Sequence, residues 1–165
     1  MKLYDAKTAP NCRRVRIFLA EKEVEVPIVE VDIAGAENRR PPYLDKNPMG
    51  TLPMLELDDG TCIAESVAIC RYFEELHPDP PLMGVGATDR ALVEMWDRRM
   101  EHELALPIQW AFRHRHEFFA GRIEQVPEWS AASRRHALKM LEWLDGELAE
   151  REFVAGSNFT IADIT

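Results

Sequence analysis

The stretch Asn47-Pro48-Met49-Gly50-Thr51-Leu52-Pro53 places two prolines and a glycine close together in the chain. Proline restricts its own φ angle and glycine permits left-handed backbone, so the stretch predicts a fixed turn between two elements. The Leu52–Pro53 bond is a candidate for the cis form. A cis proline would turn the backbone N–H and C=O of Leu52 outward, where they can pair with a peptide-like ligand. A rigid turn without a ligand is the alternative.

Patterns typical of short strands and helices surround this turn. Apolar residues recur in four strand-like runs, at 2–4, 24–31, 53–57 and 61–64. Helical spacing of apolar side chains predicts two helices, over 11–22 and 65–76. The tripeptide Asp58-Asp59-Gly60 predicts a hairpin turn between the third and fourth strands. The order β-α-β, a connection and then β-β-α predicts a small α/β domain with a mixed sheet over residues 1–77.

The second half of the chain has a different pattern. A linker rich in proline and glycine, over 78–86, separates it from the first domain. Beyond the linker no run is typical of a strand, and two apolar stripes have helical spacing. These stripes are Leu92, Trp96, Met100, Leu104 and Ile108, and then Leu138, Leu141, Leu144 and Leu148. Residues 87–165 are therefore predicted to form an all-helical domain.

The sequence ends on a pattern typical of a helix start. In Phe159-Thr160-Ile161-Ala162-Asp163, the Asp163 side chain can reach back to the Thr160 amide, which is the capping-box arrangement. Because only two residues follow Asp163, we expect the helical domain to lack its last helices. The apolar stripes around Trp96 and Leu141 would then lose a packing partner.

Composition and charge argue against several classes of protein. The 165 residues carry 20 basic and 29 acidic side chains, a net charge of −9, which disfavours a nucleic-acid partner. No apolar run reaches membrane-spanning length and Met1–Asp5 opens no signal peptide, so we expect a cytoplasmic protein without membrane binding. Three scattered cysteines, and a pair of histidines (His114 and His116) that diverge on a helix, predict no metal site.

Two further loop ends in the first domain carry candidate binding chemistry. At Thr8-Ala9-Pro10-Asn11 a helix follows the first strand, and its free amides favour an anion such as a thiolate. At Glu65-Ser66, a second helix start, the serine hydroxyl and amides can hold a carboxylate while Glu65 accepts an ammonium. An ordinary turn and a plain N-cap are the alternatives. Together with Leu52, these ends describe a site for a small thiol peptide.

The chain resembles the soluble glutathione S-transferases over essentially all of residues 1–165. The resemblance rests on the Asn-Pro-x-Gly-x-x-Pro run, on the Glu-Ser pair twelve residues after Pro53, and on the Phe-Thr-Ile-Ala-Asp helix start. It implies a thioredoxin-like first domain followed by an all-helical domain, and glutathione as co-substrate. It also implies glutathione-binding roles, with Pro53 as the cis proline, Leu52 pairing with the cysteinyl backbone, Glu65 and Ser66 at the γ-glutamyl end, and Arg39 or Arg40 at the glycine carboxylate.

The loop before the first helix departs from the family's pattern. Many members carry Ser or Cys where this chain has Ala9, and alanine can neither donate a hydrogen bond to sulfur nor form a mixed disulfide. The remaining donors are the Asn11 amide, the Thr8 hydroxyl and the N–H groups at the helix start. The Pro-Asn pair is similar to the bacterial nu-class. Cys12 stands where a Cys-Pro-x-Cys motif has its second cysteine, so core packing and a redox role are both open.

The resemblance implies an enzyme that activates the glutathione thiolate for attack on an electrophilic small molecule. Two alternatives stay open: a glutathione-binding or interaction protein without transferase activity, motivated by Ala9, and a glutathione-linked disulfide reductase that uses Cys12. Trp96, Met100 and Trp110 are candidates for the electrophile's pocket, although aromatic and Met side chains at helical spacing also pack in cores. A homodimer is expected from the resemblance.

Overall fold

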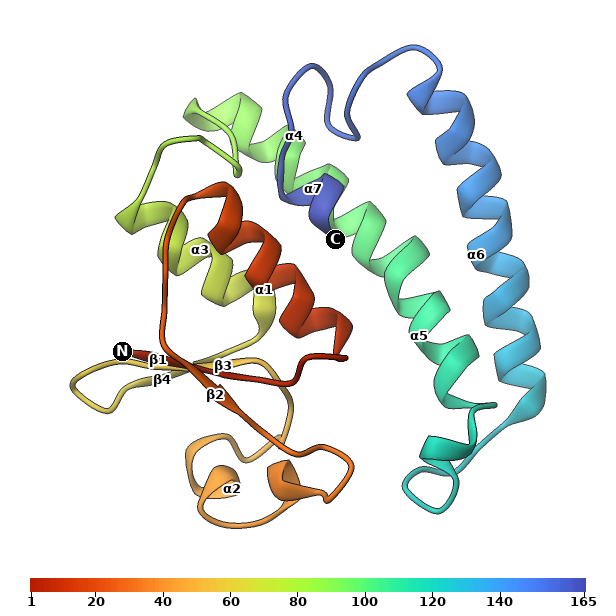
Figure 1. The fold of residues 1–165 in the computed structure, drawn as a ribbon. Coiled ribbons are helices and arrows are strands. Elements are labelled where there is room, and N and C mark those ends of the chain that lie inside the picture. Colours follow the sequence, from red (N-terminus) through yellow and green to blue (C-terminus); the bar gives the residue numbers. More distant parts are fainter. The chain divides into compact units, whose positions relative to one another are not determined.

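The computed structural model describes all 165 residues, which form two compact units (Figure 1). One unit comprises Met1–Leu82 with Ile164, and the other comprises Met83–Asp163 with Thr165. Each unit has its own buried hydrophobic cluster. None of the helices combines the length and the apolar character needed to cross a membrane.

The first unit is built on a four-stranded mixed sheet with the strand order β2-β1-β3-β4. Its strands are β1 (Lys2–Asp5), β2 (Ile28–Glu30), β3 (Met54–Glu56) and β4 (Cys62–Ala64). β1 is parallel to β2 and antiparallel to β3, and β3 is antiparallel to β4. The register places Tyr4 opposite Met54, and Met54 opposite Ala64. The carboxyl ends of β1 and β4 therefore lie beside the amino end of β3.

Helices cover both faces of this sheet (Figure 1). α1 (Pro10–Glu21) and α3 (Ser66–Leu76) lie together on one face, and the short α2 (Tyr43–Lys46) lies on the other. Pro10 occupies the first turn of α1, where its missing N–H costs nothing. Apolar side chains of α1 and α3 form the core on their face of the sheet, among them Cys12, Val15, Phe18, Ile69, Cys70 and Phe73. On the other face, Tyr43 packs with Val31 and Met54.

The elements predicted for the first unit are present. β2, β3 and β4 are shorter than predicted, and the difference is largest for β2. The turn at Asp58-Asp59-Gly60 closes a hairpin, in which the Leu57 N–H donates to the Thr61 carbonyl. The sequence pattern predicts the second strand over 24–31, whereas β2 spans only Ile28–Glu30. Pairing with β1 begins where the Leu3 N–H reaches the Pro27 carbonyl. Residues before Pro27 have no neighbouring strand to pair with.

The second unit is helical, as predicted. Its elements are α4 (Gly86–Arg99), a π-helical segment (Met100–Ala105), α5 (Leu106–Arg113), a 3-10 turn (Glu117–Phe119), α6 (Pro127–Leu148) and α7 (Ile161–Ile164). α4, the π-helical segment and α5 follow one another without a break, and α6 packs against α5. The core of this unit consists of Trp96, Met100, Leu144, Val154 and Ala162.

The first predicted stripe of the helical unit is buried only at its centre. Trp96 and Met100 lie in the core, whereas Leu92 and Ile108, at the two ends of the stripe, are exposed. A π-helical segment contains more residues in each turn than an α-helix, so it changes the angular position of the residues that follow. Pro107 lies just after this segment and cannot donate the backbone hydrogen bond that a regular α-helix requires there.

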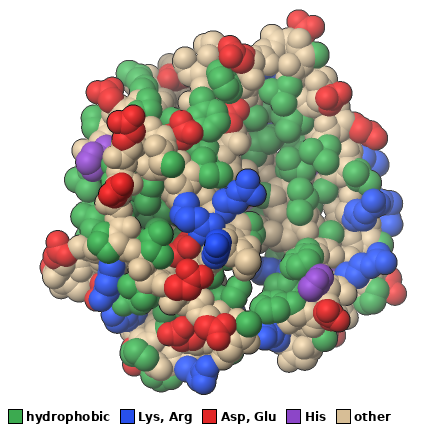
Figure 2. All heavy atoms as spheres, viewed as in Figure 1, with side chains coloured by type: hydrophobic (Ala, Val, Ile, Leu, Met, Phe, Trp, Pro, Cys, Tyr) green, Lys and Arg blue, Asp and Glu red, His purple; other side chains and the backbone are tan.

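The second predicted stripe, on α6, lies largely at the surface and not in the core of the unit. Leu144 is buried, but Leu138, Leu141 and Leu148 are exposed, and Figure 2 shows hydrophobic side chains at the surface over α5 and α6. The inward face instead carries smaller side chains, Ser130, Ser133 and Ala137, beside Leu144. The Ser130 hydroxyl donates to the Ala111 carbonyl of α5 (2.7 Å). Small residues at a helix contact permit closer helix axes, which explains this choice of face.

The capping box predicted at the last helix is confirmed. The Asp163 carboxylate accepts the Thr160 backbone N–H (2.8 Å), and the Thr160 hydroxyl accepts the Ala162 N–H (3.3 Å). Asp163 also accepts the N–H of Val154, so the same side chain holds the loop that leads to α7. The Thr165 hydroxyl donates to the fully buried Asp97 of α4.

Candidate functional site

Three loops of the first unit meet where β1 and β4 end and β3 begins. One leads from β1 into α1, one is the turn before β3, and one leads from β4 into α3. The register that aligns Tyr4, Met54 and Ala64 brings the three loops together. The residues predicted to bind the cysteinyl and γ-glutamyl parts of a thiol peptide therefore gather at this end of the sheet.

The side chain of Arg14 joins the start of α1 to the start of α3. Its Nη1 donates to the Ser66 Oγ (2.7 Å) and, at a longer distance, to the Asn11 Oδ1 (3.4 Å). Two predicted site residues on different helices are thus linked through a third residue. Sequence reasoning missed Arg14, because Ser66 lies 52 positions away and no local pattern indicates the contact.

Arg14 is buried without an acidic partner. Only 5% of its surface is exposed, none of the ion pairs includes it, and its Nε has no hydrogen-bond partner. The Arg14 guanidinium therefore places a positive charge inside the first unit. It adds to the partial positive charge at the starts of α1 and α3. This end of the sheet is therefore electrostatically favourable for an anion.

The start of α1 leaves backbone donors free. Ala9 is the N-cap residue and makes no side-chain cap. The first helical hydrogen bond runs from the Arg13 N–H to the Ala9 carbonyl (3.0 Å), so the N–H groups of Asn11 and Cys12 have no partner within the helix. The Asn11 side chain is partly exposed, whereas Thr8 is exposed and its hydroxyl makes no hydrogen bond. Of the two side-chain donors proposed for sulfur, only Asn11 is held in place.

The turn before β3 presents an unpaired backbone. The Leu52–Pro53 bond is cis, as the sequence predicts. The Leu52 side chain packs against the cluster of Val31, Tyr43 and Met54, which anchors the residue. Its backbone N–H and C=O make no hydrogen bond within the protein. Leu52 can therefore offer one donor and one acceptor to a ligand's peptide group.

Side chains from neighbouring segments hold this turn. The Tyr43 hydroxyl and the Asn47 amide both donate to the Thr51 carbonyl, at 2.5 and 2.9 Å. Burial raises the pKa of Tyr43 to about 12, which keeps its hydroxyl protonated as a donor. The Asn38 amide donates to the carbonyl of Gly50 (2.6 Å). Gly50 has a φ of +58°, so the turn requires a residue that adopts left-handed backbone.

The Glu65-Ser66 pair opens α3. Glu65 has a φ of +67°, which is unusual for a residue with a side chain. Its side chain is exposed and free of hydrogen bonds, whereas Ser66 is buried. No side chain caps α3, so backbone N–H groups of its first turn are open. The pair therefore combines free donors with an exposed carboxylate.

The two arginines predicted for a terminal carboxylate differ in position. Both are exposed. The Arg39 Nη1 donates to the carbonyl of Met49 (3.0 Å), so Arg39 lies against the turn that carries Leu52. Arg40 instead donates to the carbonyls of Gly35 and Ala36, in the preceding loop. The structure associates only Arg39 with the turn.

Cys12 lies in the core of the first unit. Its thiol is fully buried and accepts the Ala6 N–H at 3.4 Å. Burial raises the pKa of Cys12 to about 12, so the thiol is protonated at neutral pH. Thiol–disulfide exchange requires an accessible thiolate. The structure does not place Cys12 with the exposed groups of the site.

The three residues predicted to line an electrophile pocket lie in the second unit. Trp96 and Met100 belong to its core. The Trp96 ring stacks on Trp143 with centroids 5.5 Å apart, and the Arg151 guanidinium lies 3.9 Å from the Trp96 centroid. Trp110 on α5 is 37% exposed. Of the three residues, Trp110 presents a side chain to solvent.

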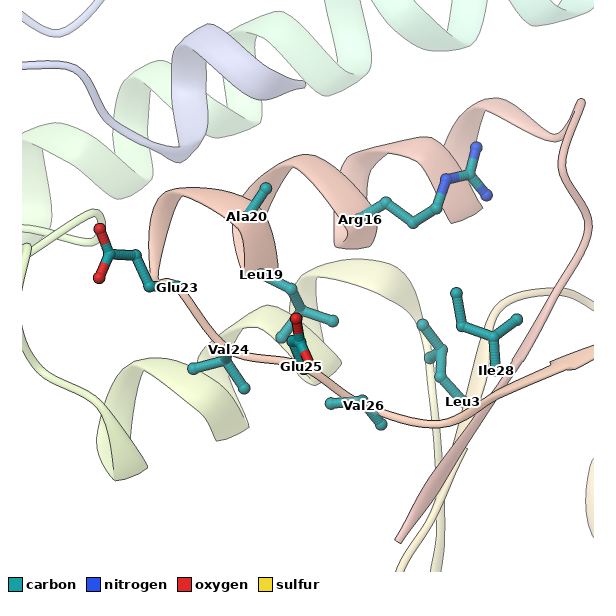
Figure 3. Close-up of a pocket in the computed structure, with 9 residues that line it drawn as sticks. All are labelled: Leu3, Arg16, Leu19, Ala20, Glu23, Val24, Glu25, Val26 and Ile28. Atoms are coloured by element: carbon teal, nitrogen blue, oxygen red, sulfur yellow. The ribbon is translucent and has the colours of Figure 1, made fainter.

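A groove of about 580 Å³ lies elsewhere in the first unit, beside α1 and the segment that leads into β2 (Figure 3). Its lining residues are Leu3, Arg16, Leu19, Ala20, Glu23, Val24, Glu25, Val26 and Ile28. None of the predicted site residues is among them, so the groove is separate from the candidate site. The protein contains no group of three or more His, Cys, Asp or Glu side chains that could hold a metal ion.

Comparison with known families and proteins relates both units to one family. Residues 3–81 match the family described as "Glutathione S-transferase, N-terminal domain", and residues 127–165 match "Glutathione S-transferase, C-terminal domain". "Glutathione S-transferase 2" of Saccharomyces cerevisiae is 39% identical over 169 residues, which cover 100% of this chain and 72% of the yeast protein. "Elongation factor 1-gamma" of Prunus avium is 33% identical over 98% of this chain but only 37% of its own length.

Solved structures support the same relationship. A glutathione S-transferase domain-containing protein of Marinobacter aquaeolei VT8 matches with a TM-score of 0.95 and 40% identity, over 99% of this chain and 82% of its own. Gtt2 of Saccharomyces cerevisiae matches with a TM-score of 0.93 and 39% identity, over 99% and 81%. The thioredoxin-like first domain and all-helical second domain predicted from the sequence are confirmed.

Proposed function

The chain belongs to the glutathione S-transferase family, and from this premise we propose that it binds glutathione as a thiolate and transfers the sulfur to an electrophilic small molecule. The observation that carries the proposal is the convergence of donors at one end of the sheet. Free N–H groups at two helix starts, the Asn11 amide and the buried charge of Arg14 all favour an anion there.

These groups are sufficient in magnitude to activate a thiol without a hydroxyl at position 9. Lowering a thiol pKa from about 8.5 by two units requires roughly 2.7 kcal/mol. A hydrogen bond to a charged group contributes about 1.5–3 kcal/mol, and a helix start about 0.3–2 kcal/mol. Asn11 and the first turn of α1 can together supply this stabilisation. Ala9 therefore does not exclude transferase chemistry.

The remaining residues of the site match the other parts of the tripeptide. The free backbone N–H and C=O of Leu52 pair with the cysteinyl residue, beside Pro53. The donors at Ser66 hold the γ-glutamyl carboxylate, and Glu65 accepts its ammonium. Arg39, which lies against the turn, holds the glycine carboxylate. Each end of glutathione then meets a group of opposite charge.

In the reaction, the bound thiolate uses a sulfur lone pair to form a carbon–sulfur bond with the electrophile. The leaving group departs with the electron pair of the bond that breaks. The thiol proton has already left on binding, so no general base is needed at the attack step. Trp110 is the candidate for contact with an apolar electrophile, since Trp96 and Met100 are engaged in the helical core.

We also propose a cytoplasmic homodimer. The family resemblance motivates the dimer, and apolar side chains exposed on α5 and α6 offer a surface for association. The chain has a mass of 19.0 kDa, so sedimentation should give twice this mass. A monomer at micromolar concentration would contradict the dimer and leave the glutathione site untouched.

An interaction protein of the same fold is the second candidate, because a protein named "Elongation factor 1-gamma" is similar over most of this chain. The reductase alternative has less support, since the thiol of Cys12 is buried and protonated. If Cys12→Ser lost disulfide reductase turnover but kept transferase turnover, this result would support the reductase alternative.

The test is calorimetric titration with reduced glutathione at pH 7, repeated in buffers of different ionisation heat. We expect binding with nearly one proton released, because the site forms the thiolate. Asn11→Ala should bind glutathione with less proton release. Binding without proton release would favour the interaction protein, and no binding would refute the proposal.

A further inference from the structure

The hydrogen bonds of Arg14 have a directional consequence for its neighbours. A guanidinium has only donors, so any group bonded to it must present an acceptor. Asn11 therefore turns its Oδ1 toward Arg14, and Ser66 turns a lone pair toward it. The two N–H donors of the Asn11 amide and the hydroxyl proton of Ser66 are then directed elsewhere. Both residues are left with donors for a ligand.

Donor direction matters because both parts of the ligand are negative. A thiolate and a carboxylate only accept hydrogen bonds, and an amide that presented its oxygen to sulfur would repel the charge. An amide side chain can reverse its oxygen and nitrogen by a simple rotation, so it needs a neighbour that decides between them. Arg14 is the neighbour that makes this choice for Asn11.

We propose that Arg14 is a positioning residue that orients Asn11 and Ser66 as donors, so that one buried guanidinium couples thiol activation to capture of the γ-glutamyl carboxylate. The inference rests on the proposed function. It goes further by assigning a role to a residue outside the set that the proposed function places against glutathione. The absence of an acidic partner supports it, because a carboxylate beside Arg14 would cancel the charge and compete for its donors.

The first experiment compares Arg14→Gln with Arg13→Gln. Arg13 is adjacent and exposed, and its side chain makes no hydrogen bond, so its variant removes the same formal charge without disturbing Asn11 or Ser66. The readout is the pKa of bound glutathione, measured from the ultraviolet absorbance of the thiolate against pH. Arg14→Gln should raise this pKa by about one unit, roughly a tenfold loss of thiolate below the pKa, and Arg13→Gln should leave it within a few tenths of a unit.

The second readout is binding of S-methylglutathione, which has both carboxylates but no thiol. Arg14→Gln should weaken it roughly fivefold, because Ser66 loses the bond that directs its hydroxyl. In Asn11→Ala, the further change Arg14→Gln should raise the thiol pKa by clearly less than it does in the parent protein, because only the direct effect of the buried charge remains once Asn11 is absent. Equal shifts in Arg13→Gln and Arg14→Gln, or full additivity with Asn11→Ala, would overturn the proposal.

If Arg14→Gln does not fold, the proposal can still be tested with a variant that keeps Arg14 and changes Asn11. Asn11→Asp places a carboxylate opposite Arg14, so the thermal midpoint should stay equal or rise. The new side chain has no donor and a negative charge, so the bound thiol pKa should rise more than in Asn11→Ala. A thiol pKa as low as in the parent protein would refute the positioning role. If the parent releases no proton on binding glutathione, the proposed function fails instead.

Discussion

At the scale of single residues, Glu65 is held in a conformation that its side chain disfavours. Its φ of +67° belongs to the left-handed region, where a non-glycine residue costs about 1–3 kcal/mol. Strain at a position proposed to hold an ammonium is consistent with a functional requirement for the carboxylate. A substitution at this position can therefore show whether Glu65 lowers the stability of the fold while it contributes to glutathione binding.

We expect Glu65→Gly to raise the free energy of unfolding by about 1 kcal/mol, because glycine adopts this φ without strain. The same variant should weaken glutathione binding, because the ammonium loses its acceptor. Urea unfolding and calorimetric titration measure the two effects. Glu23→Gly is the matched control, since Glu23 has a φ of +54° outside the site. It should stabilise the protein with unchanged affinity; unchanged affinity in Glu65→Gly would remove Glu65 from the site.

At the scale of elements, the turn before β3 requires glycine at position 50 for two reasons: the backbone has a positive φ, and there is no room for a side chain. A Cβ at this position would lie 2.7 Å from the backbone carbonyl oxygen of Asn38. Gly50→Ala should therefore destabilise the protein by more than the cost of its positive φ, by about 2 kcal/mol or more. Gly60→Ala is the control, because Gly60 has a φ of +86° with no atom within 4 Å of the added Cβ. If urea unfolding showed the same loss of stability in Gly50→Ala and Gly60→Ala, the positive φ alone would account for the loss and the contact with Asn38 would contribute nothing.

A network on the α2 face of the sheet gives the first unit an acid-sensitive contact. The Glu56 carboxylate accepts from Lys46 (2.5 Å) and from the Tyr4 hydroxyl (2.7 Å). The Lys46 bond, with that of Tyr4, lowers the pKa of Glu56 to about 2. A depressed pKa means that the native state binds the proton more weakly than the unfolded state. The contribution is therefore present above about pH 4.5 and is lost as the pH falls toward 2.

The corresponding prediction concerns Glu56→Gln. Its stability should fall less steeply than that of the parent protein between about pH 4.5 and 2, because the titrating group is gone. Urea unfolding at a series of pH values measures the two slopes. If the free energy of unfolding fell equally steeply with pH in both proteins over this range, the network would make no contribution to the loss of stability in acid.

Features that depend on neighbours in sequence were predictable at this scale, and features that depend on distant contacts were not. The Asp58-Asp59-Gly60 hairpin and the Thr160–Asp163 capping box are local, and both are present. The length of β2 depends on where β1 begins, and the inward face of α6 depends on how closely α5 approaches. Within the site, Asn11 and Ser66 belong to local motifs, but their link through Arg14 is a long-range contact.

At the scale of the whole molecule, a buried ion pair secures the end of the first unit. Lys22 Nζ and the Glu74 carboxylate are 2.5 Å apart, and both side chains are almost fully buried. Lys22 also donates to the Pro80 carbonyl, so one ammonium joins α1, α3 and the segment that precedes the second unit. Such a pair contributes little relative to an apolar replacement, but losing one partner is costly.

We expect Lys22→Ala to reduce the free energy of unfolding by about 3–5 kcal/mol, because Glu74 would lose its buried counter-ion. Arg98→Ala is the comparison, since Arg98 pairs with Glu94 and Glu101 at the surface, where a pair contributes about 0–1 kcal/mol. Urea unfolding of both variants measures the two losses of stability, and the loss in Lys22→Ala should be clearly larger. A small loss in Lys22→Ala would mean that water or another group replaces the ammonium.

The uncapped start of α1 also has an evolutionary consequence. Ala9 contributes no side-chain donor, and the free N–H groups of Asn11 and Cys12 belong to the backbone. A point mutation that replaces a side chain cannot remove a backbone amide, unless it introduces proline. Part of the anion stabilisation is therefore inherited with the fold itself. A lineage can exchange the residue at position 9 and still retain a starting level of activity from which other thiol chemistries can evolve.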